Sequence, residues 1–219
     1  MFDSSVWQMV GKGILETLYM TLFSSLLAYI VGIPLGIILV VTDKQGIRPF
    51  ITLNKILGVI VNLIRSVPFI ILLIAVTPIT RALLGTSLGP TATVVSLFFA
   101  SAPYIARLVE SSMKEVDYGV IEAAKSMGAS TMQIITRVMI PEAMPALLVG
   151  SAIAVTTILG YSAMAGVIGG GGLGDIAIRY GYHRNETDVT LITVVVLVLI
   201  VQVFQEIGMK MSRLSDKRN

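Results

Sequence analysis

Long apolar segments separated by short polar ones dominate the chain. A membrane-spanning helix needs about 20 mostly apolar residues, and five segments have that character. The last of them is rich in the β-branched residues that favour strands in water. Its length favours a helix, because an open strand cannot satisfy its backbone groups in hydrocarbon. We therefore predict an all-α membrane protein with five spans, at residues 14–41, 66–84, 92–112, 146–168 and 189–209.

Two features modify this simple pattern. Pro34 lies between Gly32 and Gly36, and we expect the first span to tilt or kink there. The apolar stretch 56–64 is expected to extend the second span along the membrane surface. No internal repeat is visible, so any symmetry must come from a second copy of the chain.

Basic residues are divided unevenly between the two sides that the spans define. Ten Lys and Arg residues fall in the loops after the first and third spans and in the C-terminal tail, whereas four fall on the opposite side. Positive residues on short loops mark the cytoplasmic side. We therefore expect a multi-pass protein of the cytoplasmic membrane, with its N-terminus outside and its C-terminus in the cytoplasm. Its parts are an external segment 1–13, a membrane domain 14–209 with a cytoplasmic loop 113–145, and a tail 210–219.

Composition excludes several kinds of chemistry. Hydrophobic residues make up 55% of the chain and charged residues 13%, against about 25% charged residues in soluble domains. Without cysteine there are no disulfides, Cys-based metal sites or thiol catalysis, and the single His183 cannot form a His-rich site. The first ten residues contain an acid and no base, so we expect no cleavable signal peptide. We expect no catalytic residue, cofactor, metal or nucleic-acid partner.

The most specific pattern lies between residues 116 and 145, and it predicts two short helices joined by a turn. Asp117 suits the N-cap of the first helix, and Gly128 suits the left-handed residue that follows it. Ser130 and Gln133 form a capping box for the second helix, which Pro141 is expected to end. Each helix carries an apolar stripe, formed by Val120, Ile121, Ala124 and Met127 in the first and Ile134, Ile135, Val138 and Met139 in the second.

Two interpretations of this hairpin remain open from the pattern alone. It is either an amphipathic hairpin lying on the membrane or an element that inserts into a groove of a soluble partner. In the second case, the small side chains of Ala123 and Ala124 would permit a close approach.

The same segment resembles the EAA loop of ABC-importer permeases. Glu122-Ala123-Ala124, Gly128 and the run Val138-Met139-Ile140-Pro141 match the spacing of that motif throughout, with Val138 and Ile140 in place of Ile and Leu. The resemblance implies a type I permease fold and a separate ATP-binding subunit that holds ATP and Mg. It also implies that the coupling element contains Glu122, Ala123, Ala124, Gly128 and Pro141.

Two further segments, NLIRSVPFIILL (62–73) and GYSAMAGVIGGGGLGDIAIRYGY (160–182), are similar to methionine importer permeases in particular. The similarity covers about residues 10–210. It implies a homodimer embedded in lipid, two ATP-binding-cassette ATPase subunits and an external methionine-binding protein. The implied function is a translocation pathway for methionine, as the L form and also the D form.

The alternatives are a related ABC importer for another small solute, a self-contained secondary carrier and an intramembrane enzyme. Secondary carriers usually show internal repeats and charges near the midplane. An enzyme would need a catalytic constellation, yet the predicted spans contain no His, Asp or Cys.

Tyr161, Ser162 and Met164 end the fourth span near its outer face. Small and polar residues in a span indicate helix packing or a gate that lines the pathway, and the resemblance favours the gate. The glycines that follow, Gly169, Gly171 and Gly174, fit G-x-G-x-x-G. A nucleotide site needs a soluble βαβ unit around that motif, so we interpret the segment as a flexible outer loop.

Charged residues within the spans are interpreted as structural anchors. Arg65 and Arg107 lie near the predicted cytoplasmic boundary, where their side chains could reach the interface. Glu110 is three residues after Arg107 and is its expected partner. Glu16, near the outer end of the first span, is interpreted in the same way.

Overall fold

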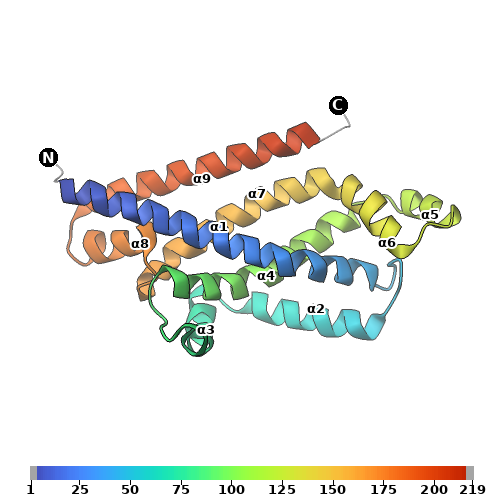
Figure 1. The fold of residues 1–219 in the computed structure, drawn as a ribbon, viewed down its shortest axis with the longest axis horizontal. Helices are drawn as coiled ribbons and strands as arrows, with labels where there is room; N and C mark the ends of the chain where they lie inside the picture. Colours follow the sequence, from blue (N-terminus) through green and yellow to red (C-terminus); the bar gives the residue numbers. More distant parts are fainter. Residues whose placement is uncertain (1–3, 216–219) are drawn as a thin grey trace.

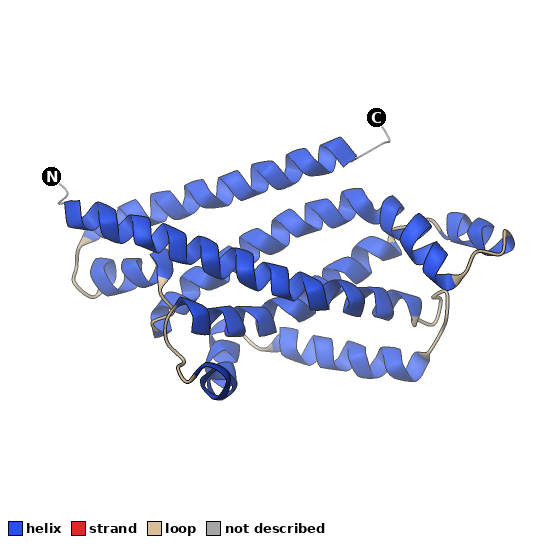
Figure 2. Ribbon diagram, viewed as in Figure 1, coloured by secondary structure: helices blue, strands red, loops and turns tan. Residues whose placement is uncertain are grey.

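The computed structural model describes residues 4–215, and helices and loops make up all of this part (Figure 2). The long helices run along the long axis of the molecule. The start of α1 and α8 lie at one end, α5 and α6 lie at the other, and α9 runs from the first end toward the second (Figure 1). The α-helices are α1 (Ser4–Val41), α2 (Ile51–Ser66), α3 (Phe69–Leu84), α4 (Pro90–Lys114), α5 (Tyr118–Ser126), α6 (Thr131–Ile134), α7 (Ile140–Ala165), α8 (Gly172–Ile176) and α9 (Thr187–Ser215). Short turns of other helix types are the π-helices η1 (Ile135–Met139) and η3 (Ala177–Tyr182) and the 3₁₀ helix η2 (Gly166–Ile168).

Four of the predicted spans correspond to helical runs that are long and apolar enough to cross a membrane: α1, α4, the run containing α7, and α9. α1 begins at Ser4 and continues through Pro34 without a break. Residues 4–13 of the predicted external segment are therefore part of the same helix. In the predicted tail, α9 continues to Ser215. Residues 1–3 and 216–219 lie outside the described part of the chain.

The predicted second span, 66–84, corresponds to α3 from Phe69 onward, but the stretch before it does not extend it in the same direction. α2 and α3 are bent by 109° at a short break, and α2 runs beside the long helices while α3 is seen end-on (Figure 1). Pro68 explains the break, because proline lacks a backbone N–H and disfavours the helical conformation of the residue before it. Val67 is accordingly extended, with φ −79° and ψ 126°. The segment expected to lie on the surface, 56–64, thus belongs to a helix parallel to the spans.

α1 packs closely against α4, and two glycines four residues apart make this approach possible. A Cβ atom at Gly32 would lie 2.7 Å from the Ile105 side chain, and one at Gly36 would lie 2.6 Å from the carbonyl oxygen of Ala106. Ile105 and Ala106 are themselves fully buried. Small residues at this spacing are a common means of bringing membrane helices into contact. The contact places the buried face of α4 at the centre of the subunit.

The glycine-rich segment after α7 is not the flexible loop that we expected. It folds back as η2 and α8 against the N-terminal half of α1 and the C-terminal end of α7, and all residues of α8 are buried. The backbone N–H of Gly172 donates to Glu16 at 2.8 Å, and that of Leu173 donates to the Thr17 hydroxyl at 2.9 Å. A Cβ at Gly174 would lie 2.1 Å from the carbonyl oxygen of Ala163. Close backbone approach orders this segment and confirms Glu16 as a structural anchor.

We predict that Gly36→Val lowers the stability of the subunit by about 1–3 kcal/mol, the usual cost of overpacking a core contact. Gly11→Val provides the matched control. Gly11 lies in the same helix, and a Cβ there would meet nothing within 4 Å. The measurement is the thermal unfolding midpoint of the detergent-solubilised variants. Equal midpoints for the two would contradict the assignment of Gly36 to the contact between α1 and α4.

Candidate functional site

The hairpin α5–α6 at one end of the molecule is defined by local capping interactions, and the predicted caps are confirmed. The Asp117 carboxylate accepts a hydrogen bond of 2.7 Å from the Gly119 N–H. Ser130 and Gln133 form the capping box, with the Ser130 N–H donating to the Gln133 side chain at 2.8 Å. Gly128 is left-handed, with φ +78°. These interactions fix the turn independently of the rest of the protein.

Gly128 takes part in a helix-ending pattern that satisfies two carbonyl groups of α5. Its own N–H donates to the Lys125 carbonyl at 2.9 Å, and the next N–H, from Ala129, donates to the Ala124 carbonyl at 3.1 Å. This pair of bonds is the Schellman motif, which favours glycine at the left-handed position. Nothing lies within 4 Å of a Cβ at Gly128, so the requirement for glycine there is conformational and not steric.

The predicted apolar stripe of α5 divides between two sides of the helix. Ile121 and Ala124 are 7% and 4% exposed and pack into the main hydrophobic core, so Ala124 is not available to a partner as we had expected. Ile134, Ile135 and Met139 are buried in the same core. The hairpin is therefore fixed to the body of the protein. Its outward side exposes Glu122 and Ala123 together with the large side chains of Tyr118, Val120, Met127 and Met132.

Pro141 does not end the second helix, and this expectation was wrong. Helical structure continues from α6 through η1 into α7, where Pro141 occupies the first turn. Because the helical run is continuous here, the absence of an N–H at Pro141 removes one backbone hydrogen bond from the run without ending it. The five residues of η1 take the wider π form just before it. The hairpin is thus joined directly to a membrane-spanning helix.

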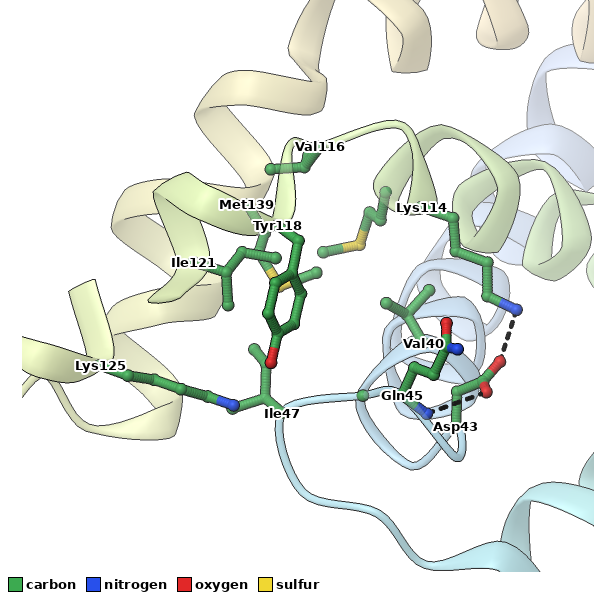
Figure 3. Close-up of a pocket in the computed structure, with 12 residues that line it drawn as sticks. Val40, Asp43, Gln45, Ile47, Lys114, Val116, Tyr118, Ile121, Lys125 and Met139 are labelled. Atoms are coloured by element: carbon green, nitrogen blue, oxygen red, sulfur yellow. Dashed lines mark hydrogen bonds and ion pairs between the residues drawn. The ribbon is translucent and has the colours of Figure 1, made fainter. Parts of the chain in front are cut away.

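A cavity of 330 Å³ lies between α5 and the loop that follows α1 (Figure 3). Lys114, the last residue of α4, donates to Asp43 at 2.6 Å along one side of it. This hydrogen bond and the lysine charge hold the pKa of the Asp43 carboxyl below its usual value. The remaining lining is mostly apolar and comes from the end of α1 and the loop after it, the end of α4 and the residues that follow it, α5 and η1. It includes Val40, Ile47, Met113, Val116, Ile121 and Met139.

Asp43 and Lys114 belong to a line of charges that sequence reasoning had only partly identified. Glu110 is nearly buried and receives hydrogen bonds from Lys114, at 2.9 Å, and from Arg107. Arg107 also donates to the Gly58 carbonyl at 3.0 Å and to Asn62. The predicted pair of Arg107 and Glu110 is confirmed. The line joins the C-terminal half of α4 to α2 and to the loop after α1.

Arg65 lies in the last turn of α2, just before the break that separates this helix from α3. It is the fourteenth residue after the start of α2, about 21 Å along that helix at 1.5 Å per residue. Its guanidinium lies 5.9 Å from the centre of the Tyr104 ring, near the middle of α4. The side chain is exposed and takes no part in the line of charges.

The three predicted gate residues differ in what they reach. Tyr161 stacks on Phe69 with ring centres 4.4 Å apart, so it links α7 to α3. Ser162 is 0% exposed, and its hydroxyl donates to the Leu159 carbonyl at 2.7 Å. Ser162 is therefore a packing residue inside the subunit, and the interpretation of it as a pathway residue is corrected. Met164 is exposed at the outer end of α7.

Comparison with known proteins gives consistent results over the whole chain. Residues 6–217 match the family described as binding-protein-dependent transport system inner membrane component. The probable D-methionine transport system permease protein MetI of Vibrio cholerae is 47% identical over 93% of this chain and 90% of its own length. The methionine import system permease protein MetP of Bacillus subtilis is 47% identical over 93% and 91%. Among solved structures, a chain of the MetNI methionine ABC transporter in inward-facing conformations superposes with a TM-score of 0.96, at 39% identity over 99% of this chain and 100% of that one.

We predict that Glu110→Gln destabilises the subunit by about 1–3 kcal/mol, because two cationic partners lose a buried acceptor charge. Glu115→Gln serves as the control, since Glu115 is exposed at the end of the same helix and forms no ion pair with any residue of 4–215. Its unfolding midpoint should equal that of the wild type. A wild-type midpoint for Glu110→Gln would show that the line of charges adds no stability.

Proposed function

Because the chain belongs to the family of binding-protein-dependent transport system inner membrane components, we propose that it is the membrane-spanning subunit of an ATP-driven importer of methionine. The match over residues 6–217 supports the class of protein. The names of the similar permeases support the solute, in its L form and also its D form. In this proposal the chain hydrolyses no ATP itself, and a separate ATP-binding subunit supplies the energy.

The observation that carries the proposal is the construction of the hairpin α5–α6. Its inward side is buried in the core, and its outward side exposes Met127 and Met132, which are 81% and 67% accessible. Exposed apolar side chains on a rigid cytoplasmic projection are typical of a docking surface. We propose that this side, with Glu122 and Ala123, inserts into a groove on the ATP-binding subunit. In this proposal Gly128 shapes the turn of the hairpin. Pro141 lies in the first turn of α7, the helix that would move when the ATP-binding subunit displaces the hairpin.

We further propose that two copies of the chain form the pathway, with two ATPase subunits and an external methionine-binding protein. One copy without an internal repeat has no symmetric partner within itself, and two-fold homodimers are the commonest closed assembly. The loop after α1, the start of α2, the end of α4, the hairpin with η1 and the end of α9 lie toward one end of the molecule (Figure 1). They carry eight of the fourteen basic residues of 4–215: Lys44, Arg48, Lys55, Lys114, Lys125, Arg137, Lys210 and Arg213. That end is proposed to be cytoplasmic, which leaves the N-terminus outside.

The first prediction from this proposal concerns coupling. Gly128→Val places a β-branched residue in the left-handed conformation, which costs about 1–2 kcal/mol, and distorts the docking surface. Glu122→Lys reverses an exposed charge on the same surface. Both variants should insert into the membrane and yet abolish ATP-driven uptake of radiolabelled methionine, and Gly128→Val should also weaken retention of the ATPase. Uptake and retention are measured in the same membranes, and solute binding by the external protein should be unchanged.

Gly85→Val is the matched control for Gly128→Val. Gly85 also has a left-handed conformation, with φ +74°, and a Cβ there would meet nothing within 4 Å. It ends α3, far from the hairpin in the chain, so its substitution should carry the same backbone cost and leave ATPase retention intact. If Gly128→Val and Glu122→Lys both retain the ATPase and transport at the wild-type rate, the hairpin is not the coupling element.

The second prediction concerns the outer gate, to which we assign Met164 with Tyr161 as its support. Met164 from the two copies is expected to approach the two-fold axis and close the pathway. Met164→Ala should raise solute leak or ATP hydrolysis without cargo, whereas Met211→Ala, an exposed methionine on α9, should change neither. The chain lacks cysteine, so Met164→Cys gives a single thiol. Failure of this thiol to cross-link between copies in every nucleotide state would argue strongly against the gate.

A further inference from the structure

Arg65 is an exposed cation in the middle of the membrane-spanning part of the protein. It lies against Tyr104, which is about 15 Å from the cytoplasmic end of α4 and about 21 Å from the outer end, at 1.5 Å per residue. A charge at this depth is costly unless it faces water or an opposite charge. Arg65 therefore cannot face lipid at that depth without a large penalty.

Within residues 4–215, no carboxylate lies within ion-pairing distance of Arg65. Arg107, which lies one turn further along α4 from Tyr104, differs in this respect. Its guanidinium is occupied by Glu110, by Asn62 and by the carbonyl of Gly58. Of these two arginines, Arg65 is the one that retains a free set of donors.

Arg65 lines a cavity of 790 Å³ whose walls come from α4 and α7. The α4 side carries Tyr104, Arg107, Glu110 and Lys114, with Glu115 just beyond the helix, and the Glu110 carboxylate is already bonded to Arg107 and Lys114. The α7 side is apolar, with Val149 and Ile153 both exposed and Gly150 between them. The volume is large enough for a small amino acid with its hydration water. A cationic group beside an apolar wall suits a molecule with a carboxylate at one end and an apolar side chain at the other.

An exposed stripe on α7 connects this cavity with the outer gate. Val149, Ile153, Gly160 and Met164 are all exposed, and their spacing of four, seven and four residues places them on one face of a helix. Ile153 and Met164 are about 16 Å apart along the axis. The face that carries the gate residue is thus the face that opens on the Arg65 cavity.

We propose that Arg65 binds the carboxylate of the amino acid in transit, after it has passed Met164 and before it is released to the cytoplasm. The inference rests on the proposed function, and it adds a solute site within the membrane subunit. A guanidinium stays charged at any physiological pH and binds a carboxylate through two parallel hydrogen bonds. The apolar wall formed by Val149 and Ile153 would contact the solute side chain. This site would bind the carboxylate, which all amino acids share. Selectivity for the side chain would therefore come from the external binding protein.

The test compares L-methionine with L-methioninol, which lacks the carboxylate, as ligands of the permease–ATPase complex in nanodiscs without the external protein. Binding is followed by saturation-transfer NMR, which detects weak ligands. Wild-type complex should bind methionine about tenfold more tightly than methioninol, the loss expected for one charge-assisted contact. Arg65→Gln should weaken methionine binding by a similar factor and leave methioninol binding unchanged. Arg65→Lys should recover part of the loss.

Arg81→Gln is the matched control, because Arg81 is another exposed arginine, bonded to Ser87 at the other end of α3. It should bind methionine like the wild type. The inference is overturned if Arg65→Gln binds methionine as tightly as the wild type, or if methioninol binds the wild type as tightly as methionine. ATP-driven uptake by the wild-type transporter with its external protein tests the proposed function separately. Absence of methionine uptake there would reject the proposed solute, whatever the binding results.

Discussion

The close contact between α1 and α4 is the constraint on which the rest of the structure depends. In lipid, apolar surfaces gain little by leaving the solvent, so helices associate through tight packing and polar contacts. Gly32 and Gly36 give α1 a flat strip against which Ile105 and Ala106 fit. α1 then extends past this contact in both directions. Glu16 and Thr17 hold α8 near one end of it, and Asp43, just beyond the other end, holds α4 through Lys114.

Polar groups in the subunit are placed according to the same constraint. Hydroxyl groups inside the helices mostly bond to their own backbone, as those of Ser24, Thr156 and Ser162 do. Arg107, Glu110 and Lys114 form a line of charges along the C-terminal half of α4, which joins this helix to α2 and to the loop after α1. Lys12 pairs with Glu16, and Arg179 with Asp175, within single helical runs. Arg65 lines a cavity and has no ion-pair partner among residues 4–215.

Sequence reasoning succeeded where structure is determined within a few residues and failed where it depends on distant ones. The caps at Asp117 and Ser130 and the left-handed Gly128 involve partners at most five residues away, so their pattern is complete in the sequence. Hydropathy locates the long helices but not all of their ends, since α1 begins ten residues before the predicted first span. The outward or inward direction of Ala124 and Ser162 depends on what packs against each helix, which no local pattern records. The bond between Asp43 and Lys114 joins positions 71 residues apart.

Pro68 and Pro141 show that a proline in the sequence does not by itself predict where a helix ends. Both residues lack a backbone N–H. At Pro68 the helix axis bends by 109° between α2 and α3, whereas at Pro141 the helical run continues from η1 into α7. The difference lies in whether the turn before the proline can widen to accommodate it, as η1 does. Proline signals a change in backbone hydrogen bonding, and the surrounding packing decides whether that change becomes a break.

The continuity through η1 has a mechanical consequence. Loops absorb displacement because their dihedral angles are soft, whereas a helix resists both bending and stretching. Between Thr131 in the hairpin and Ala165 at the outer end of α7, helical structure is not interrupted by any loop. The 26 residues of α7 make this helix about 39 Å long. A displacement imposed on the hairpin at one end of α7 therefore reaches the opposite end with little loss. In the function proposed above, a movement of the docking surface on the hairpin would therefore be carried to the proposed gate residue Met164 without passing through a flexible loop.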